Sequence, residues 1–316
     1  MLQLQPNNLL IHTTLTERLD PAAVPLAIDR IVTDYDFTTY HISNLENKSQ
    51  ILVSMSIKCF PDLRKYGVDG VMAREYGAYV TTPEAGYDVS LLLDLETTSA
   101  LSDAVRAELV EKVSYFKRNA MAAAFERAFE RFDVLSQESV AKQVDLYAPE
   151  NTSDEEILVL NYRDDEQIFI RPSFDRVTVI FSTIFKDETD KIFGKVFLQE
   201  FVDARKRAVQ NAPQVLYSHK EPPLELSRLG VKQEENKGFI TFVLFPRHLA
   251  PTRRENCITH IQFFRNYFHY HIKCSKAYMH SRMRFRVSEF LKVLNRAKPE
   301  NLEVERKTAT GRRFEH

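Results

Sequence analysis

Hydrophobic and polar residues alternate along two early segments of the chain, and this alternation predicts β-strands. Residues 35–42 and 51–59 are rich in β-branched and aromatic side chains, and the polar residues 44–49 between them predict a turn. A short helical pattern then begins at Pro61 and ends at Gly77. The chain therefore opens with strands followed by a helix of medium length.

A hairpin and a long helix complete this first pattern. The hairpin strands are predicted at residues 78–81 and 87–95, on either side of a turn that contains Pro and Gly. Ser102 can cap a helix in which apolar residues recur every three or four positions up to Phe132. We expect one continuous helix with a single buried stripe.

The same order of elements recurs after residues 136–155, which are polar and predict a linker. Strands, a medium helix, two further strands and a long helix follow again, with the strands at 157–162, 167–171, 176–185, 215–218 and 238–245 and the medium helix at 191–209. The repeated order predicts a duplicated α/β unit.

The fold class is therefore α/β in the α+β sense. We expect two similar domains, each a mostly antiparallel sheet with flanking helices, plus a very long C-terminal helix. The predicted parts are a first domain (1–135), the linker (136–155), a second domain (156–250), the long helix (251–298) and a tail (299–316).

The last helix is the most informative element, because residues 252–298 contain neither Gly nor Pro. At about 1.5 Å per residue an unbroken helix of this length spans about 70 Å. Its apolar stripe has an average spacing near that of a straight helix and consists of Ile258, Ile261, Phe264, Phe268, Ile272, Met279, Met283, Val287, Phe290 and Leu294. A domain of ordinary size cannot cover such a helix, so we expect part of it to pack on another chain.

Charge changes this picture, because it is unevenly distributed. The composition is that of a globular protein, with 44% apolar and 28% charged residues and a net charge of -1. Residues 247–316 nevertheless hold 16 basic against 6 acidic residues, which leaves 27 basic and 38 acidic in residues 1–246. The basic C-terminal segment indicates an anionic partner for that end of the chain.

The three cysteines, Cys59, Cys257 and Cys274, are too few and too far apart for a disulfide framework, which favours a reducing, cytoplasmic location. The first residues lack the basic and apolar regions of a signal peptide. No stretch approaches about 18 uncharged apolar residues, so we expect no transmembrane segment.

Four residues of the long helix have the types of a zinc site: Cys257, His260, His271 and Cys274. The two pairs are separated by about 16 Å along a continuous helix, however, so packed core side chains are the favoured interpretation. The acidic run at 164–166 lies between two predicted strands and is interpreted as a solvated hairpin turn rather than a metal site. The motifs of phosphate-binding loops, hydrolase elbows and zinc proteases do not occur, and we expect neither catalysis nor a cofactor.

A run of basic residues follows the aromatic part of the helix. It contains a single acidic residue, Glu289, and its basic members include Arg282, Arg284, Arg286, Lys292, Arg296 and Lys298. A solvated helix face or complementation of the helix dipole is one interpretation. The other is electrostatic docking to an acidic protein filament, membrane surface or nucleic acid. Arg205, Lys206 and Arg207 form a second, weaker basic cluster.

Several long segments resemble a known family, the subunit 2 family of the actin-related protein 2/3 complex, the larger scaffold subunits of that actin-branching machine. They include RVTVIFSTIFKDETDKIFGKVFLQEF (176–201), ITFVLFPRH (240–248) and YFHYHIKCSKAYMHSRMRF (267–285), with GYDVSLLLDLE (86–96) in the first half and KTATGRRF (307–314) in the tail. The resemblance covers roughly residues 35–314.

The resemblance implies a non-catalytic scaffold in the cytoplasm, at cortical actin structures. Its long helix is expected to pack against the long helix of subunit 4, and the same pair to contact the mother actin filament. On this basis we assign core and partner-helix packing to Ile258, Ile261, Phe264, Phe268 and Ile272. Filament contact is inferred from charge for Arg282, Arg284, Arg286, Lys292, Arg296 and Lys298. Nucleic acid is not expected as a partner.

Two hypotheses of other classes remain at this point. The chain could be a free-standing binder of acidic lipid or nucleic acid through the basic helix, or a metalloenzyme that uses the Cys and His set. A scaffold subunit should be poorly soluble alone, whereas a free-standing binder should purify as a soluble monomer.

Overall fold

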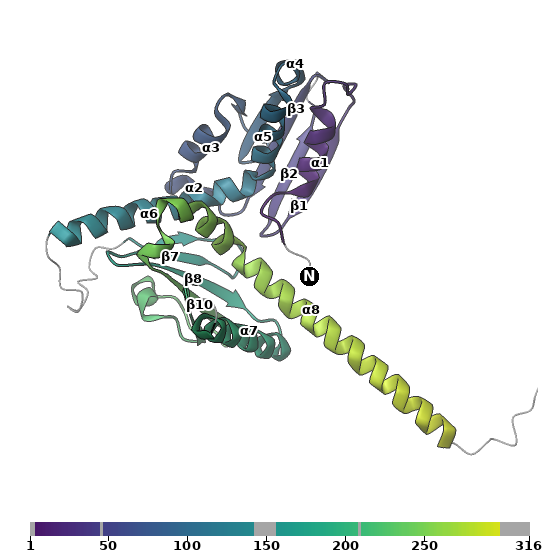
Figure 1. Ribbon diagram of the computed structural model, residues 1–316, viewed down its shortest axis with the longest axis vertical. Coiled ribbons are helices and arrows are strands. Elements are labelled where there is room, and N and C mark those ends of the chain that lie inside the picture. Colours follow the sequence, from purple (N-terminus) through teal and green to yellow (C-terminus); the bar gives the residue numbers. More distant parts are fainter. Residues whose placement is uncertain (1–3, 45–46, 142–155, 208–209, 298–316) are drawn as a thin grey trace, which may run out of the picture. The chain divides into compact units, whose positions relative to one another are not determined.

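The fold contains two five-stranded sheets, seen in a computed structural model that describes residues 4–44, 47–141, 156–207 and 210–297. The chain divides into two compact units, Met1–His269 and Tyr270–His316. Both sheets belong to the first unit (Figure 1). The boundary falls inside the last helix, and each unit is described by itself.

Both sheets are antiparallel and have the same topology, which confirms the predicted duplication of the fold. Their strand orders are β1-β2-β3-β5-β4 and β6-β7-β8-β10-β9, so the fifth strand of each sheet lies between the third and the fourth. The strands are β1 (Asp29–Asp34), β2 (Thr38–Ser43), β3 (Gln50–Ile57), β4 (Val80–Thr81), β5 (Val89–Asp94), β6 (Leu158–Leu160), β7 (Ile168–Pro172), β8 (Val177–Ile184), β9 (Gln214–His219) and β10 (Lys237–Leu244).

Helices occupy equivalent places in the two halves. After the third strand the first half has α2 (Phe60–Lys65) and α3 (Val68–Tyr76), and the second half has α7 (Glu188–Arg207). After the fifth strand come α4 (Leu95–Ser99), α5 (Asp103–Ser114) and α6 (Phe116–Ala141) in the first half and α8 (Pro251–Ala297) in the second. The remaining elements are α1 (Leu9–Arg18) and the short 3-10 helices η1 (Gly77–Tyr79), η2 (Leu224–Leu229) and η3 (Pro246–His248).

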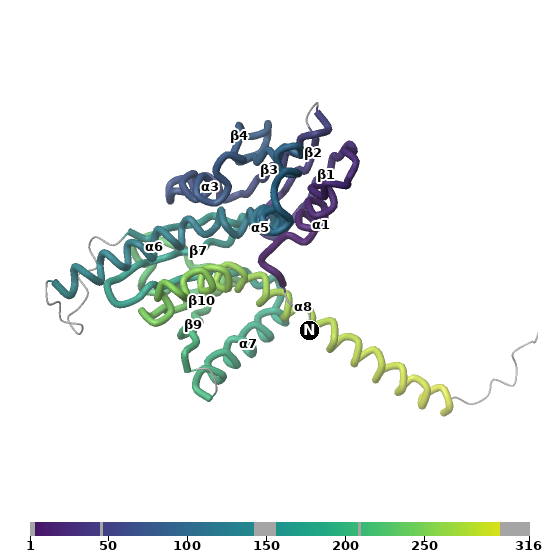
Figure 2. The backbone as a smooth tube through the Cα atoms, turned by 45° about the horizontal axis from the view of Figure 1, so that its top comes forward, coloured from purple at the N-terminus to yellow at the C-terminus, as the bar shows by residue number. Residues whose placement is uncertain are grey.

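The helices pack on one another and along the sheets. In Figures 1 and 2, α1 and α5 run side by side, α3 packs on α6, and α7 lies along β9. The first core contains fully buried residues from β2, β3 and β5 together with aromatic residues of α6: Tyr40, Ile42, Val53, Met55, Leu91, Phe116 and Phe125. Alternation of apolar residues along the strands produces this core.

Two local predictions were wrong, each for a reason outside the local sequence. The helix expected from residue 102 onward is interrupted at Tyr115, because the Ser114 carbonyl accepts a hydrogen bond from the Asn8 N–H at 2.8 Å. The strand expected at 35–42 begins only at Thr38, because Asp36 and Phe37 have φ values of 63° and 54° and form the hairpin turn.

The predicted linker also overlaps a helix. α6 extends through Ala141, so residues 136–141 are helical, and the rest of the predicted linker lies outside the described residues. In the part of the chain that the structure describes, no helix is long and apolar enough to cross a membrane.

Candidate functional site

α8 is one helix of 47 residues, as its lack of internal Gly and Pro predicts (Figure 1). Its part within the first unit, residues 251–269, packs on the second sheet through aromatic rings. The ring of Phe264 lies 4.5 Å from that of Phe242 and 5.4 Å from that of Phe181, measured between centroids. The side chains of Ile258, Ile261 and Phe268 are buried beside it. This part of α8 is a core element of its own chain.

A buried arginine joins the first half of the chain to the start of α8. Arg118, near the start of α6, donates hydrogen bonds to the Glu255 carboxylate at 2.6 Å and to the Thr259 hydroxyl at 3.0 Å. It also donates to the Glu255 carbonyl and to the Asn119 side chain. With only 8% of Arg118 exposed, its charge depends on these acceptors.

A second ion pair joins α8 to the second sheet. Arg265 donates two hydrogen bonds to the two carboxylate oxygens of Glu166, at 2.8 and 3.0 Å. Glu166 also accepts hydrogen bonds from the Ile184 N–H at 2.9 Å and from the Thr183 hydroxyl at 3.1 Å. The expectation that residues 164–166 form a solvated turn is therefore wrong for Glu166, which is 4% exposed because two arginines hold it inside.

Asp36, in the β1–β2 turn, connects these elements. It accepts hydrogen bonds from Arg163 at 2.9 Å, from Asn266 of α8 at 3.0 Å and from Lys117 of α6 at 3.1 Å. Since Arg163 also pairs with Glu166 at 3.2 Å, the two carboxylates share one cation. We call the set Asp36, Lys117, Arg163, Glu166 and Arg265 the base network.

Both carboxylates of the base network are held ionised. Burial by itself would raise the pKa of Asp36, but the charge of Lys117 and the hydrogen bonds from Asn266, Lys117 and Arg163 lower it below its ordinary value. Burial likewise opposes ionisation of Glu166, and Arg265 with the Ile184 N–H lowers its pKa. The network therefore fixes the base of α8 to both sheets at neutral pH.

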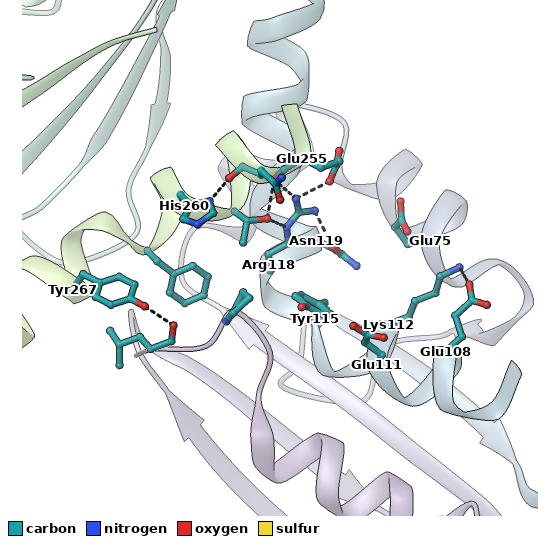
Figure 3. Close-up of a pocket in the computed structure, with 15 residues that line it drawn as sticks. Glu75, Glu108, Glu111, Lys112, Tyr115, Arg118, Asn119, Glu255, His260 and Tyr267 are labelled. Carbon is teal, nitrogen blue, oxygen red and sulfur yellow. Dashed lines mark hydrogen bonds and ion pairs between the residues drawn. The ribbon is translucent and has the colours of Figure 1, made fainter. Parts of the chain in front are cut away.

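A groove of about 590 Å³ lies beside this base, between α5, α6 and the first turns of α8 (Figure 3). Several of its polar side chains are already engaged in contacts within the chain. Lys112 pairs with Glu108 at 3.2 Å, Tyr267 donates to the Leu4 carbonyl at 2.7 Å, and His260 bonds the Asn256 carbonyl at 2.6 Å. Figure 3 shows Arg118 directed at Glu255 and Asn119. The arrangement pairs no nucleophile with a base and gives no reason to place catalysis here.

The part of α8 beyond residue 276 has a different character. Every residue from 277 to 297 is exposed, and large apolar side chains are among them. Nine such side chains have exposed fractions of 44 to 63%: Tyr278, Met279, Met283, Phe285, Val287, Phe290, Leu291, Val293 and Leu294. Five of them continue the predicted stripe and are named here the distal stripe: Met279, Met283, Val287, Phe290 and Leu294.

Helix geometry separates Arg284 from the other described basic residues of this part of α8. Residues four apart share a side of a helix and residues two apart do not, so Arg282 lies with Arg286 and Lys292 with Arg296, while Arg284 faces elsewhere. Arg282 donates to the Tyr278 hydroxyl at 3.2 Å, and Lys292 pairs with Glu289 at 2.8 Å. Arg282, Arg286, Lys292 and Arg296 therefore lie on one side of the distal stripe, and Arg284 lies on its other side.

The residues assigned to packing are occupied within this chain. Ile258, Ile261 and Phe268 of the first unit are 1 to 6% exposed, and Phe264 is partly buried among aromatic rings. Ile272, in the second unit, is 1% exposed. The apolar surface of α8 that is left for another chain lies beyond residue 276 and includes the distal stripe. The basic residue Lys298 lies outside the described residues.

The remaining candidate residues are also located. Cys257, His260, His271 and Cys274 lie along the continuous α8, and within the described ranges no three His, Cys, Asp or Glu side chains are grouped to hold a metal ion. In the last turn of α7, Arg205 donates to the Ala212 carbonyl at 3.0 Å and Arg207 lies 3.8 Å from Asp203.

The sequence analysis missed the base network and Arg118. One signal was available: Arg118 and Asn119 directly precede a run of small apolar residues in a helix that must be buried. Asp36 and Glu166 gave no such signal, because their partners in α8 lie 230 and 99 positions away in sequence.

Comparison with known proteins gives consistent results over almost the whole chain. The family model described as "Arp2/3 complex, 34 kD subunit p34-Arc" matches residues 53–301. A protein of Schizosaccharomyces pombe named actin-related protein 2/3 complex subunit 2 is 51% identical over 319 residues, covering 99% of each chain. The protein of the same name from Dictyostelium discoideum is 39% identical over 290 residues, covering 91% of each.

Proposed function

The chain belongs to the p34-Arc family of Arp2/3 complex subunits, and from this membership we propose that it is a non-catalytic scaffold subunit of that actin-nucleating complex. It would work in the cytoplasm, at cortical actin structures. The near-complete coverage of two relatives named as subunit 2 supports this assignment. Its work is mechanical: to hold a long helix where other subunits and a filament can bind it.

The observation that carries the proposal is the exposed distal stripe. Large apolar side chains at spacings of three and four residues form one continuous face, and soluble monomers rarely expose contiguous apolar patches of this kind. We propose that the long helix of subunit 4 packs on it, antiparallel to α8. Full burial of a Leu, Val, Phe or Met side chain contributes about 1.5–3 kcal/mol, so five such residues supply a substantial driving force.

Pull-down of subunit 4 with variants of α8 tests this pairing. The variant Met283→Asp, Val287→Asp, Phe290→Asp places three charges in the distal stripe, and we expect it to lose subunit 4 from the purified complex. The matched control is Ser281→Asp, Ser288→Asp, Asn295→Asp, which adds the same charge on the opposite side of the same helix turns. Equal recovery of subunit 4 with both variants would contradict the pairing.

We propose further that the basic residues around the distal stripe contact the mother actin filament. Arg282, Arg284, Arg286, Lys292 and Arg296 are exposed and are accompanied by one acidic residue, Glu289, which favours docking to an acidic filament. Because they lie beside the stripe or on the opposite side of α8, they remain accessible when a partner helix covers the stripe.

Co-sedimentation with actin filaments tests the filament contact. Arg282→Glu, Arg284→Glu, Arg286→Glu should leave the complex assembled, weaken co-pelleting several-fold, and reduce the dependence of pelleting on salt. Arg127→Glu, Arg131→Glu, Lys186→Glu is the control, since it makes the same change in net charge at exposed positions of α6 and the β8–α7 turn. Unchanged pelleting of the α8 variant would place the filament contact elsewhere.

Solubility distinguishes this proposal from a free-standing binder of acidic lipid or nucleic acid. A scaffold with an unpaired distal stripe should aggregate when expressed alone and become soluble when co-expressed with subunit 4. A monodisperse monomer that binds anionic vesicles or nucleic acid would contradict it.

A further inference from the structure

A second groove, of about 490 Å³, lies between α7 and β9 and has no part in the contacts of α8 proposed above. The groove is lined by three basic side chains, Lys195, Arg205 and Lys206, and by no acidic one. Its other lining residues include Leu198, Val202 and Leu216, which give it an apolar floor. We call it the α7–β9 groove.

The lining of the groove is strongly positive for a chain whose residues 1–246 are acidic overall. Neighbouring cations have acidic partners: Lys191 pairs with Glu188 at 3.4 Å, Lys220 with Glu235 at 2.8 Å, and Arg207 lies near Asp203. Lys195 and Lys206 have no ion pair among the described residues, and Arg205 donates to a backbone carbonyl. Their charges are available to an anionic partner.

The pKa of the neighbouring His219 indicates the same positive electrostatic potential. Partial burial lowers the pKa of His219, at the end of β9, and the positive charges of Lys191, Lys195 and Lys220 lower it further. A region in which a proton is disfavoured by surrounding lysines attracts carboxylates.

One wall of the groove is a sheet edge, formed by residues 214–217 of β9. β9 is the last strand in the order β6-β7-β8-β10-β9 and pairs only with β10 among the described strands. An edge strand presents unpaired N–H and C=O groups that can form a ladder with another extended chain. Leu216, in the middle of β9, is 48% exposed, and the consecutive residues 214–217 all line the groove, so the groove follows the strand itself.

From this juxtaposition of a basic helix face, an apolar floor and an open strand edge, we propose that the α7–β9 groove binds an extended acidic segment of a partner protein as an added strand beside β9. The backbone of the segment would pair with β9, its carboxylates would meet Lys195, Arg205 and Lys206, and its apolar side chains would cover Leu198, Val202 and Leu216.

The same features favour a polypeptide over other anions. A lipid headgroup or a free phosphate uses clustered cations but has no use for a strand edge, and a single-stranded nucleic acid needs several aromatic platforms, of which the lining offers one, Tyr217. Only an extended peptide uses the charges, the floor and the edge together.

Fluorescence anisotropy with defined peptides on the purified complex tests the proposal. The probe is a labelled peptide of about eight alternating Asp and Val residues, roughly the length of a strand. We expect saturable binding, at least tenfold weaker binding of the same peptide with Lys in place of Asp, and a similar loss when all internal backbone nitrogens are methylated, which removes the N–H groups on both edges of the peptide. Methylation keeps the charge and removes the ladder, so equal binding of the methylated peptide would overturn the added strand.

Charge-reversal variants locate the site. The variant Lys195→Glu, Lys206→Glu should weaken binding of the probe about tenfold or more, because two attractive contacts become repulsive. Lys186→Glu, Arg207→Glu makes the same net change at positions that do not line the groove and should bind the probe normally. Equal affinity of both variants, absence of binding to the complex, or displacement of the probe by anionic vesicles or RNA but not by unlabelled peptide would each overturn the proposal. Neither variant touches the distal stripe, so recovery of subunit 4 tests the scaffold proposal separately.

Discussion

The two ends of α8 have the same sequence pattern and opposite environments. Apolar residues recur at spacings of three and four through both, yet Ile258 is 1% exposed and Phe290 is 63% exposed. The first part has a sheet, aromatic rings and two ion pairs around it. The contacts given for the described distal residues 277–297, such as that of Arg282 with Tyr278, lie within the helix itself. Periodicity identifies the face that a helix buries, but the partner for that face need not belong to the same chain.

The largest expected difference in stability is between two variants that carry the same Phe→Ala substitution at opposite ends of α8. Phe268→Ala should lower the free energy of unfolding by about 3–5 kcal/mol, because it leaves a cavity in a close-packed core. Phe290→Ala should change it by less than about 0.5 kcal/mol and instead weaken recovery of subunit 4. Amide hydrogen exchange of β7 and β8 in the complex measures the difference. Equal protection of these strands from hydrogen exchange in the two variants would contradict the claim that only the first part of α8 belongs to the core.

The base network should come next in size. Glu166→Ala leaves Arg265 and Arg163 without their shared carboxylate, and we expect a loss of about 2–3 kcal/mol, limited by the partial exposure of both arginines. Asp165→Ala, the neighbouring residue in the same turn and exposed, is the control. The measurement is again hydrogen exchange, read at the start of α8. Similar exchange in the two variants would mean that the ion pair does not anchor the helix.

The base network also predicts that the stability of the folded chain decreases at acidic pH. The pKa values of Asp36 and Glu166 are below their ordinary values in the folded chain, so their contribution to stability is complete above about pH 5 and is lost as the pH falls through the folded values. Glu166→Gln cannot lose a proton, so the slope of stability against pH below about pH 5 should be smaller than in the unmodified chain. Parallel slopes in acid titrations of unfolding would contradict this.

The smallest effect concerns the local contacts of the distal part. Arg282 lies 5.7 Å from the centre of the Tyr278 ring and donates to its hydroxyl. In a peptide of residues 270–297, a double-mutant cycle of Tyr278→Ala and Arg282→Ala cancels the helix propensity of Ala and should give a coupling of about 0.5 kcal/mol, measured by helical circular dichroism. A complete loss of helicity would mean that this single contact maintains the distal helix.

How far the sequence predicted the molecule depends on the range of the interactions involved. The length of α8 and the repeated order of strands and helices follow from local signals, namely the absence of Gly and Pro over 252–298 and the alternation along each strand. The interruption at Tyr115 could not be predicted, because it depends on the N–H of Asn8.

Prediction of the exposed surface of α8 was limited in the same way, by contacts between residues far apart in the sequence. The stripe along α8 was predicted in full, but the point at which it leaves its own chain was not, since burial depends on which elements the fold brings beside it. Glu166 was placed in a solvated turn because acidic residues between strands usually lie in solvent, and its partner Arg265 belongs to a helix 99 positions away.

Hydroxyl-radical footprinting of the assembled complex tests the central claim most directly, because it reports the exposure of individual side chains. A peptide of residues 270–297 provides the unprotected rates for Met279, Met283 and Phe290, and Met55, which is fully buried, serves as the protected standard within the complex. If a partner helix covers the distal stripe, these three residues should oxidise in the complex at rates close to that of Met55. Oxidation at the rates of the free peptide would show that the distal stripe is uncovered and would contradict the account.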